Sequence, residues 1–277
     1  MRSYQEMIDT ILQVANEDNR IEGVLLNGSR ANPNSQSDRF QDYDVVYITD
    51  HVNEIVQDDD WINQFGEVLI KQLPDYNPYV KDYSVFGYLV HFKDLNRIDL
   101  RLMKPDLLST QINDAYSIVL LDKNNRYSHL NFNQESELYS TKLCSEFEFQ
   151  QITNEIYWVS TYVIKGIARE DLIYAEFMLS NPVKKAFIEL IKQWILTDNN
   201  REELNFGKVN QAILNDLKDK EAFIQLYCNQ NLEAIEDNVR YIIEQTHRLA
   251  GQIAKKQGFK YRDEEYKAVK YYLEQIL

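Results

Sequence analysis

Cysteine is scarce in this sequence, and long apolar runs are missing. The 277 residues include two cysteines, Cys144 and Cys228, which lie far apart and have no partner at the spacing of zinc ligands. Two such thiols favour a reducing compartment over a disulfide framework. No apolar stretch approaches the ~20 residues of a membrane helix, and the N-terminus carries no apolar signal segment. The sequence therefore predicts a cytoplasmic protein without a membrane span.

Positive charge is also in short supply. Lysine and arginine number 30 against 44 aspartates and glutamates, which gives a formal net charge of −14. This balance argues against nucleic acid as a partner, since phosphate backbones are bound through basic side chains. It equally argues against a helical ribonuclease built on Arg240 and His247, although these residues would share a helix face. An acidic cleft would concentrate a cationic small molecule, while the alternative is that the acidity only aids solubility.

Residues 24–47 combine an apolar strand, a Gly-Ser turn, a polar loop and a second apolar strand that carries Asp42 and Asp44. Side chains alternate along a strand, so the two aspartates are expected on one face, where repulsion and burial require a nearby cation. Carboxylate oxygens suit Mg²⁺. Gly28 would let a ligand approach the backbone closely, and Ser29 offers a hydroxyl and an N–H group to a phosphate. The alternative is an ordinary hairpin with a polar loop.

This arrangement resembles the nucleotidyltransferase superfamily, whose members carry an apolar strand ending in Gly-Ser and then Asp-x-Asp between apolar residues. The superfamily places a third carboxylate on a neighbouring strand, and Asp99 matches that position. Within residues 97–103, Ile98 and Leu100 alternate with Asp99 and Arg101, so Asp99 should point away from the apolar side. An edge strand with a solvated polar face is the alternative.

The order of the segments predicts two domains. Strands are expected at residues 21–26, 43–49, 83–92, 97–103 and 117–121, and helices at residues 3–16, 52–56, 60–70 and 105–115. Residues 123–135 are polar and have the composition of a linker. Only helices are expected after the linker, with a new one beginning at Pro182. We therefore predict an α+β fold, with a nucleotidyltransferase-type mixed sheet and helices in residues 1–135 and a helical bundle in residues 136–277.

A narrower resemblance comes from the second half of the chain. The segments Asn-Glu-Ile-Tyr-Trp-Val at residues 154–159, Tyr-Val-Ile-Lys-Gly at residues 162–166 and Leu-Ile-Tyr-Ala at residues 172–175 add to the Gly-Ser-Arg turn and the Gln-Asp-Tyr-Asp motif. Together they resemble the aminoglycoside 6-adenylyltransferase family, also called streptomycin adenylyltransferases. The resemblance follows the whole chain, with departures at Ile156-Tyr157 and after residue 200.

Four residues of the helical half are candidates for ligand contact. Lys165 and Arg169 would share one helix face, and the resemblance implies that this face lies over the nucleotide phosphates. A solvated basic pair is the alternative. Glu155 and Trp158 also share a face, and a carboxylate beside an aromatic ring would suit a guanidinium or ammonium group. The alternative is a core tryptophan with a surface glutamate.

The resemblance implies a complete reaction. Asp42, Asp44 and Asp99 would hold Mg²⁺, while Gly28, Ser29, Arg30 and Lys165 would bind ATP. Asp99 would also act as general base for a hydroxyl of the acceptor, which the family implies is streptomycin. Another aminoglycoside or a protein side chain as acceptor, and a non-enzymatic antitoxin-like relative, are the alternatives. A monomer is the favoured assembly.

Overall fold

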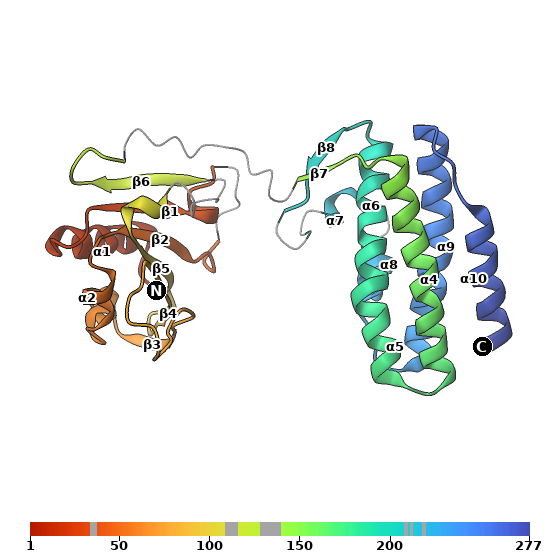
Figure 1. Ribbon diagram of the computed structural model, residues 1–277, viewed down its shortest axis with the longest axis horizontal. Helices are drawn as coiled ribbons and strands as arrows, with labels where there is room; N and C mark the ends of the chain where they lie inside the picture. Colours follow the sequence, from red (N-terminus) through yellow and green to blue (C-terminus); the bar gives the residue numbers. More distant parts are fainter. Residues whose placement is uncertain (34–37, 109–115, 128–139, 208–209, 211–212, 218–219) are drawn as a thin grey trace. The chain divides into compact units, whose positions relative to one another are not determined.

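The computed structural model describes residues 1–33, 38–108, 116–127, 140–207, 210, 213–217 and 220–277. The chain forms two compact units, residues 1–138 and 139–277, which are coloured red to yellow and green to blue in Figure 1. The first unit holds a six-stranded sheet with helices, and the second unit is mainly helical. The predicted α+β fold is thus confirmed. None of the described helices combines the length and the apolar character that crossing a bilayer requires.

The sheet of the first unit has the strand order β3-β4-β5-β2-β1-β6. Its strands are β1 (Gly23–Asn27), β2 (Tyr43–Ile48), β3 (Val68–Gln72), β4 (Val85–Phe92), β5 (Arg97–Met103) and β6 (Ser117–Asp122). Strands β2 and β5 run parallel, and every other neighbouring pair is antiparallel. The strand that carries Asp44 is therefore central, as the apolar sequence predicts.

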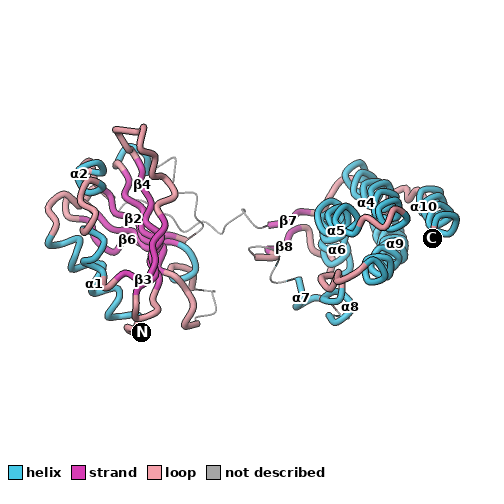
Figure 2. Tube along the Cα trace, turned by 90° about the horizontal axis from the view of Figure 1, so that it is seen from below, coloured by secondary structure: helices cyan, strands magenta, loops and turns pink. Residues whose placement is uncertain are grey.

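Helices α1 (Tyr4–Glu17) and α2 (Val52–Val56) lie on the same side of this sheet (Figure 2). Helix α1 begins with a capping box in which Ser3 and Glu6 satisfy each other's backbone N–H groups. Its apolar residues, with Met7 and Ile11 fully buried, pack in one cluster with strand residues such as Leu26. One face of the sheet is therefore dry, and polar side chains of the inner strands must point to the other face.

The predicted helix over residues 60–70 is wrong. Trp61–Phe65 forms only a 3-10 turn, which ends at Gly66 with φ of 141°, a conformation that L residues rarely adopt. The following residues pair with β4 as edge strand β3, where Leu69 and Ile70 are 56% and 63% exposed. The backbone therefore turns only over Trp61–Phe65, although the apolar residues keep a helical period to Ile70. Of the predicted helix over residues 105–115, Pro105–Leu107 forms a 3-10 turn, and residues 109–115 lie outside the described part.

A half-buried carboxylate ties the end of α1 to the aromatic core. Asp18 accepts hydrogen bonds from Arg20 Nε and Nη2 at 2.9 and 2.7 Å and from Trp61 Nε1 at 3.0 Å. Burial alone would raise the pKa of Asp18, but these hydrogen bonds outweigh it and lower the pKa to about 2. A lowered pKa means that the ionised carboxylate stabilises the fold, and that protonation removes this stabilisation.

Asp18→Asn is therefore expected to lower the free energy of unfolding by about 1–2 kcal/mol at pH 7, after allowance for solvent screening. The difference from the wild type should be constant above pH 4, shrink between pH 4 and pH 2, and vanish below that range. Urea denaturation of both proteins across this range measures the difference. A difference that persists unchanged at pH 2 would show that the ionised carboxylate is not its source.

The second unit is a helical bundle. Its elements are β7 (Ser140–Lys142), α4 (Glu146–Ala168), α5 (Leu172–Met178), α6 (Lys184–Asp198), β8 (Glu203–Asn205), α7 (Ile213–Asp216), α8 (Lys220–Gln225), α9 (Leu232–Gln257) and α10 (Asp263–Ile276). The long helices α4, α6 and α9 pack around one apolar cluster and are seen nearly end-on in Figure 2.

Two sequence predictions for this unit are wrong. The chain does not break before Pro182, because a π-helical turn over Leu179–Val183 carries α5 directly into α6. The second half is also not free of strands, because β7 and β8 form a two-stranded antiparallel ribbon. Each of these strands is only three residues long, too short to leave an alternating pattern.

Candidate active site

Four neighbouring strands place polar side chains on the face of the sheet opposite α1. The strand registers pair Asn27 with Asp44, Asp44 with Asp99, and Asn27 with Ser117. A polar row thus runs across β6, β1, β2 and β5. The next residues along β1, β2 and β5, which are Leu26, Val45 and Leu100, belong to the apolar cluster under α1, so alternation points the polar row away from it.

The three aspartates singled out in the sequence meet at this row. Asp42 directly precedes β2, and one carboxylate oxygen each of Asp42, Asp44 and Asp99 lie within 4.8 Å of one another. All three residues are half-buried. Carboxylates at this spacing repel each other, and the repulsion is relieved by a cation.

Arg97 supplies part of that positive charge. Its Nε and Nη2 donate to the two carboxylate oxygens of Asp99 at 2.7 and 2.6 Å, and its Nε lies 3.8 Å from Asp42 Oδ2. The hydrogen bonds to Asp99 raise the pKa of Arg97 above its already high ordinary value, so the guanidinium stays charged. Arg97 was not among the residues predicted from the sequence, although alternation along β5 places it on the face of Asp99.

The Gly-Ser-Arg turn follows β1 as a 3-10 turn. Gly28 has φ of 69°, and a Cβ atom on it would lie 2.2 Å from Asp44 Oδ2. The glycine is therefore required both by its backbone conformation and by the close approach of Asp44. Ser29 lies in the turn and is half-buried.

The Arg30 side chain binds backbone carbonyl oxygens, whereas the sequence predicts that it contacts a phosphate. Its Nε and Nη2 donate to the backbone carbonyl oxygens of Asp42 and Gln41 at 2.9 and 2.6 Å. Its guanidinium lies 3.9 Å from the centre of the Tyr43 ring. These contacts fix the start of β2, so Arg30 positions Asp42 through the backbone.

Gly28→Ala is expected to lower turnover at least about 100-fold, because the added methyl group must displace the Asp44 carboxylate. Gly258→Ala is the matched control, since Gly258 has φ of 75° but a Cβ atom on it would face open space, with no described side chain within 4 Å. Both substitutions strain the backbone, and only the first disturbs the aspartates. Steady-state rates of the two variants separate these effects, and equal losses in both would refute the role of Gly28.

Two buried polar atoms of the polar row lack a hydrogen-bond partner among the described residues. They are Asn27 Oδ1 and Ser117 Oγ, and both residues are 5% exposed. An unsatisfied buried acceptor costs about 1–3 kcal/mol, so such groups often mark a functional site. Asn27 is the cross-strand neighbour of Asp44, which adds an amide oxygen to the carboxylate oxygens of the row.

This donor set fits a hard divalent cation. Three carboxylates and an amide oxygen are ligands of the kind that Mg²⁺ binds, whereas no described histidine or cysteine belongs to the cluster. The missing side chain of Gly28 leaves room for the Asp44 carboxylate at the end of β1. The residues present therefore suit a magnesium-dependent phosphate chemistry.

Helix α4 carries the predicted ligand residues of the second unit. Glu155 is exposed, and Trp158 is 59% exposed and donates from Nε1 to the Tyr162 hydroxyl at 3.0 Å. The alternative of a core tryptophan is thereby wrong. Lys165 Nζ lies 4.8 Å from the centre of the Tyr162 ring, and no described carboxylate lies within ion-pair distance of it. Arg169 is exposed at the end of the helix.

Comparisons with known proteins place this chain in a family. The family model for streptomycin adenylyltransferase matches residues 1–276. The aminoglycoside 6-adenylyltransferase of Bacillus subtilis (strain 168) is 32% identical over 229 residues, 80% of this chain and 78% of that protein. Its counterpart from Campylobacter jejuni is 30% identical over 236 residues, 84% of this chain and 81% of that protein. A crystal structure of an aminoglycoside 6-adenyltransferase from Bacillus subtilis covers 100% of this chain and 99% of its own, with 26% identity and a TM-score of 0.47.

The family match extends over nearly the whole chain and includes all three aspartates. The resemblance drawn from the sequence is therefore confirmed: this chain is a nucleotidyltransferase that belongs to the streptomycin adenylyltransferase family.

Proposed function

We propose that this enzyme transfers AMP from ATP to a hydroxyl group of an aminoglycoside, with streptomycin as the acceptor and Mg²⁺ as the metal. The observation that carries the proposal is the cluster of Asp42, Asp44 and Asp99, with oxygens within 4.8 Å of one another. An antitoxin-like relative without activity would have no need to retain three mutually repelling carboxylates. The names of the relatives support an aminoglycoside as acceptor.

Asp42, Asp44 and Asp99 would hold the metal, with the Asn27 amide oxygen as a further ligand. Bound there, Mg²⁺ supplies positive charge against the phosphates of ATP. Ser29 would donate its hydroxyl and backbone N–H group to the outer phosphates at the turn after β1. Arg30 would hold Asp42 in place through the backbone rather than contact a phosphate.

Asp99 would act as the general base. The acceptor hydroxyl oxygen forms a bond to the α-phosphorus of ATP, the bond from that phosphorus to pyrophosphate breaks, and the hydroxyl proton passes to Asp99. Arg97 holds both oxygens of Asp99 in a fixed orientation. The same guanidinium would offset the charge of Asp42 while the phosphates are bound.

The helical unit would supply ligand contacts from α4. Streptomycin carries guanidinium groups, which are attracted to carboxylates and to aromatic faces. Glu155 offers the carboxylate and Trp158 the exposed ring. Lys165, with no described carboxylate partner, would contact a phosphate of ATP.

The test is product analysis by mass spectrometry after incubation with Mg-ATP and streptomycin, kanamycin or spectinomycin. A mass gain of one AMP on streptomycin, with little product from the other two, is expected. Modification of kanamycin alone would refute the acceptor and leave the chemistry standing. No modification of any aminoglycoside, with release of pyrophosphate from ATP intact, would favour a different acceptor class.

Glu155→Gln is expected to raise the KM for streptomycin about fivefold with little change in the KM for ATP, because an exposed ion pair contributes up to about 1 kcal/mol. Glu264→Gln, at an exposed position in the first turn of α10, is the matched control. Initial rates at varied streptomycin and at varied ATP separate the two constants. An equal rise in both, or an effect shared by the control, would remove Glu155 from the acceptor site.

A further inference from the structure

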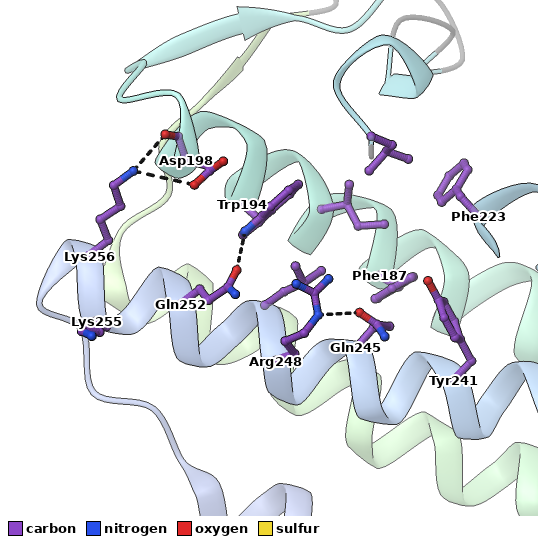
Figure 3. Close-up of a pocket in the computed structure, with 13 residues that line it drawn as sticks. Phe187, Trp194, Asp198, Phe223, Tyr241, Gln245, Arg248, Gln252, Lys255 and Lys256 are labelled. Atoms are coloured by element: carbon purple, nitrogen blue, oxygen red, sulfur yellow. Dashed lines mark hydrogen bonds and ion pairs between the residues drawn. The ribbon is translucent and has the colours of Figure 1, made fainter. Parts of the chain in front are cut away.

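The helical unit contains a cavity that the proposed reaction does not use. It has a volume of about 620 Å³ and lies between α6 and α9, with Phe223 at its upper side in Figure 3. Pockets that bind small molecules usually measure roughly 300–1,000 Å³. None of the residues assigned above to ATP, metal or acceptor lines it.

The floor of the cavity is apolar and partly aromatic. Phe187, Ile191 and Leu249 line it and are at most 3% exposed, and the larger rings of Trp194 and Tyr241 stand at its sides. Such walls favour a flat apolar body over a hydrated sugar. The floor therefore selects a ligand of a different kind from an aminoglycoside.

The polar groups of the cavity present hydrogen-bond donors. Trp194 Nε1 donates to Gln252 Oε1 at 2.7 Å, and Arg248 Nε donates to Gln245 Oε1 at 2.7 Å (Figure 3). Both amide oxygens are thus occupied by lining residues, and both amide groups keep their NH₂ donors for a ligand. These polar residues form the rim of the cavity, and the ligand group that matches them is a hydrogen-bond acceptor.

The charged side chains of the rim also favour a ligand with an acceptor group. Asp198 is the one carboxylate among the described lining residues, and Lys256 Nζ lies 4.0 Å from its carboxylate and donates to its backbone carbonyl oxygen at 2.9 Å. Arg248 and Lys255 also line the cavity, and neither forms an ion pair with a carboxylate in the described part of the chain. Two such cations in one pocket of a chain with net charge −14 make a local site for an anion.

We propose that this cavity binds a small organic anion whose flat apolar body lies against Trp194 and the floor, and whose carboxylate or sulfonate is held by Arg248 and Lys255. The ligand is opposite in charge to an aminoglycoside. The site would therefore act separately from the acceptor site, and the proposal holds whichever acceptor the enzyme uses.

The probe is 1-anilinonaphthalene-8-sulfonate, compared with its neutral analogue N-phenyl-1-naphthylamine, in fluorescence titrations of the full chain. Arg248→Gln should raise the Kd of the sulfonate about fivefold, and Arg248→Gln with Lys255→Gln at least about tenfold, while the Kd of the neutral probe changes less than about twofold. Lys260→Gln, an exposed lysine outside the cavity, is the control and should change neither Kd.

Circular dichroism of each variant establishes that the exposed substitutions leave the fold intact. Mg-ATP at saturation should not displace the sulfonate. Displacement by Mg-ATP would place the probe at the nucleotide site and overturn the proposal. Equal affinity for both probes, with no effect of the Arg248 and Lys255 substitutions, would overturn it as well.

Discussion

Asp44→Asn should lower turnover about 10³-fold. Asp44 is the central member of the polar row, with Asn27 and Asp99 as its neighbours on either strand. Loss of its charge weakens the binding of the metal. A bound metal stabilises the transition state by several kcal/mol, and each 1.36 kcal/mol of activation free energy changes the rate by a factor of about ten. Initial rates at saturating ATP and acceptor, with Mg²⁺ varied, measure the effect.

The same substitution should leave the melting temperature unchanged or raise it. Three carboxylates with oxygens within 4.8 Å of one another repel in the folded state, and the amide removes one of the charges. Asp59→Asn, at an exposed position of the same unit, is the control and should retain full activity. An Asp44→Asn enzyme with wild-type turnover would show that the row does not bind the metal. A lowered melting temperature would show that the lost activity reflects the fold.

Asp99→Asn should lower kcat about 10²- to 10⁴-fold, the usual contribution of a general base. Asparagine can still accept one hydrogen bond from Arg97, so the geometry should hold while the ability to take a proton is lost. The Kd for Mg-ATP, measured by calorimetry without acceptor, should change much less than kcat. A collapse of ATP affinity with an unchanged kcat would make Asp99 a metal ligand only.

The contact between Arg97 and Asp99 allows a second test of the role of Asp99. Since Arg97 donates to both oxygens of Asp99, its replacement by glutamine should disturb Asp99 and also lower kcat. If Arg97 acts through Asp99, the double variant should be no slower than Asp99→Asn alone. Losses that multiply in the double variant would give Arg97 a separate role, such as a direct contact with a phosphate.

The alternation of side chains along a strand is what allows the sequence to predict part of the candidate site. Asp42 and Asp44 are two residues apart, and Ile98 and Leu100 assign Asp99 to a polar face, so each face follows from local pattern. That β5 lies beside β2 does not follow from local pattern. That expectation came from the family resemblance, and the register of the parallel pair places Asp44 opposite Asp99.

Features that depend on the register between strands or on a single backbone angle could not be predicted from the sequence. Asn27 and Ser117 join the row only because β1 and β6 align them, and nothing near either residue in sequence indicates this. The helical period of residues 60–70 was misleading because Gly66 ends the turn and the next residues pair with β4. In the helical unit, the π-helical turn that contains Pro182 joins α5 to α6, where the local rule predicts a break.

Transfer of radioactive label from ATP tests the central claim most directly. With ATP labelled at the α-phosphorus and streptomycin as acceptor, the label should appear on the antibiotic in the presence of Mg²⁺ and stay in ATP with the Asp44→Asn enzyme. With ATP labelled at the γ-phosphorus, the label should appear in pyrophosphate. Label from the γ-phosphorus on the antibiotic would show phosphoryl rather than adenylyl transfer and would contradict the account.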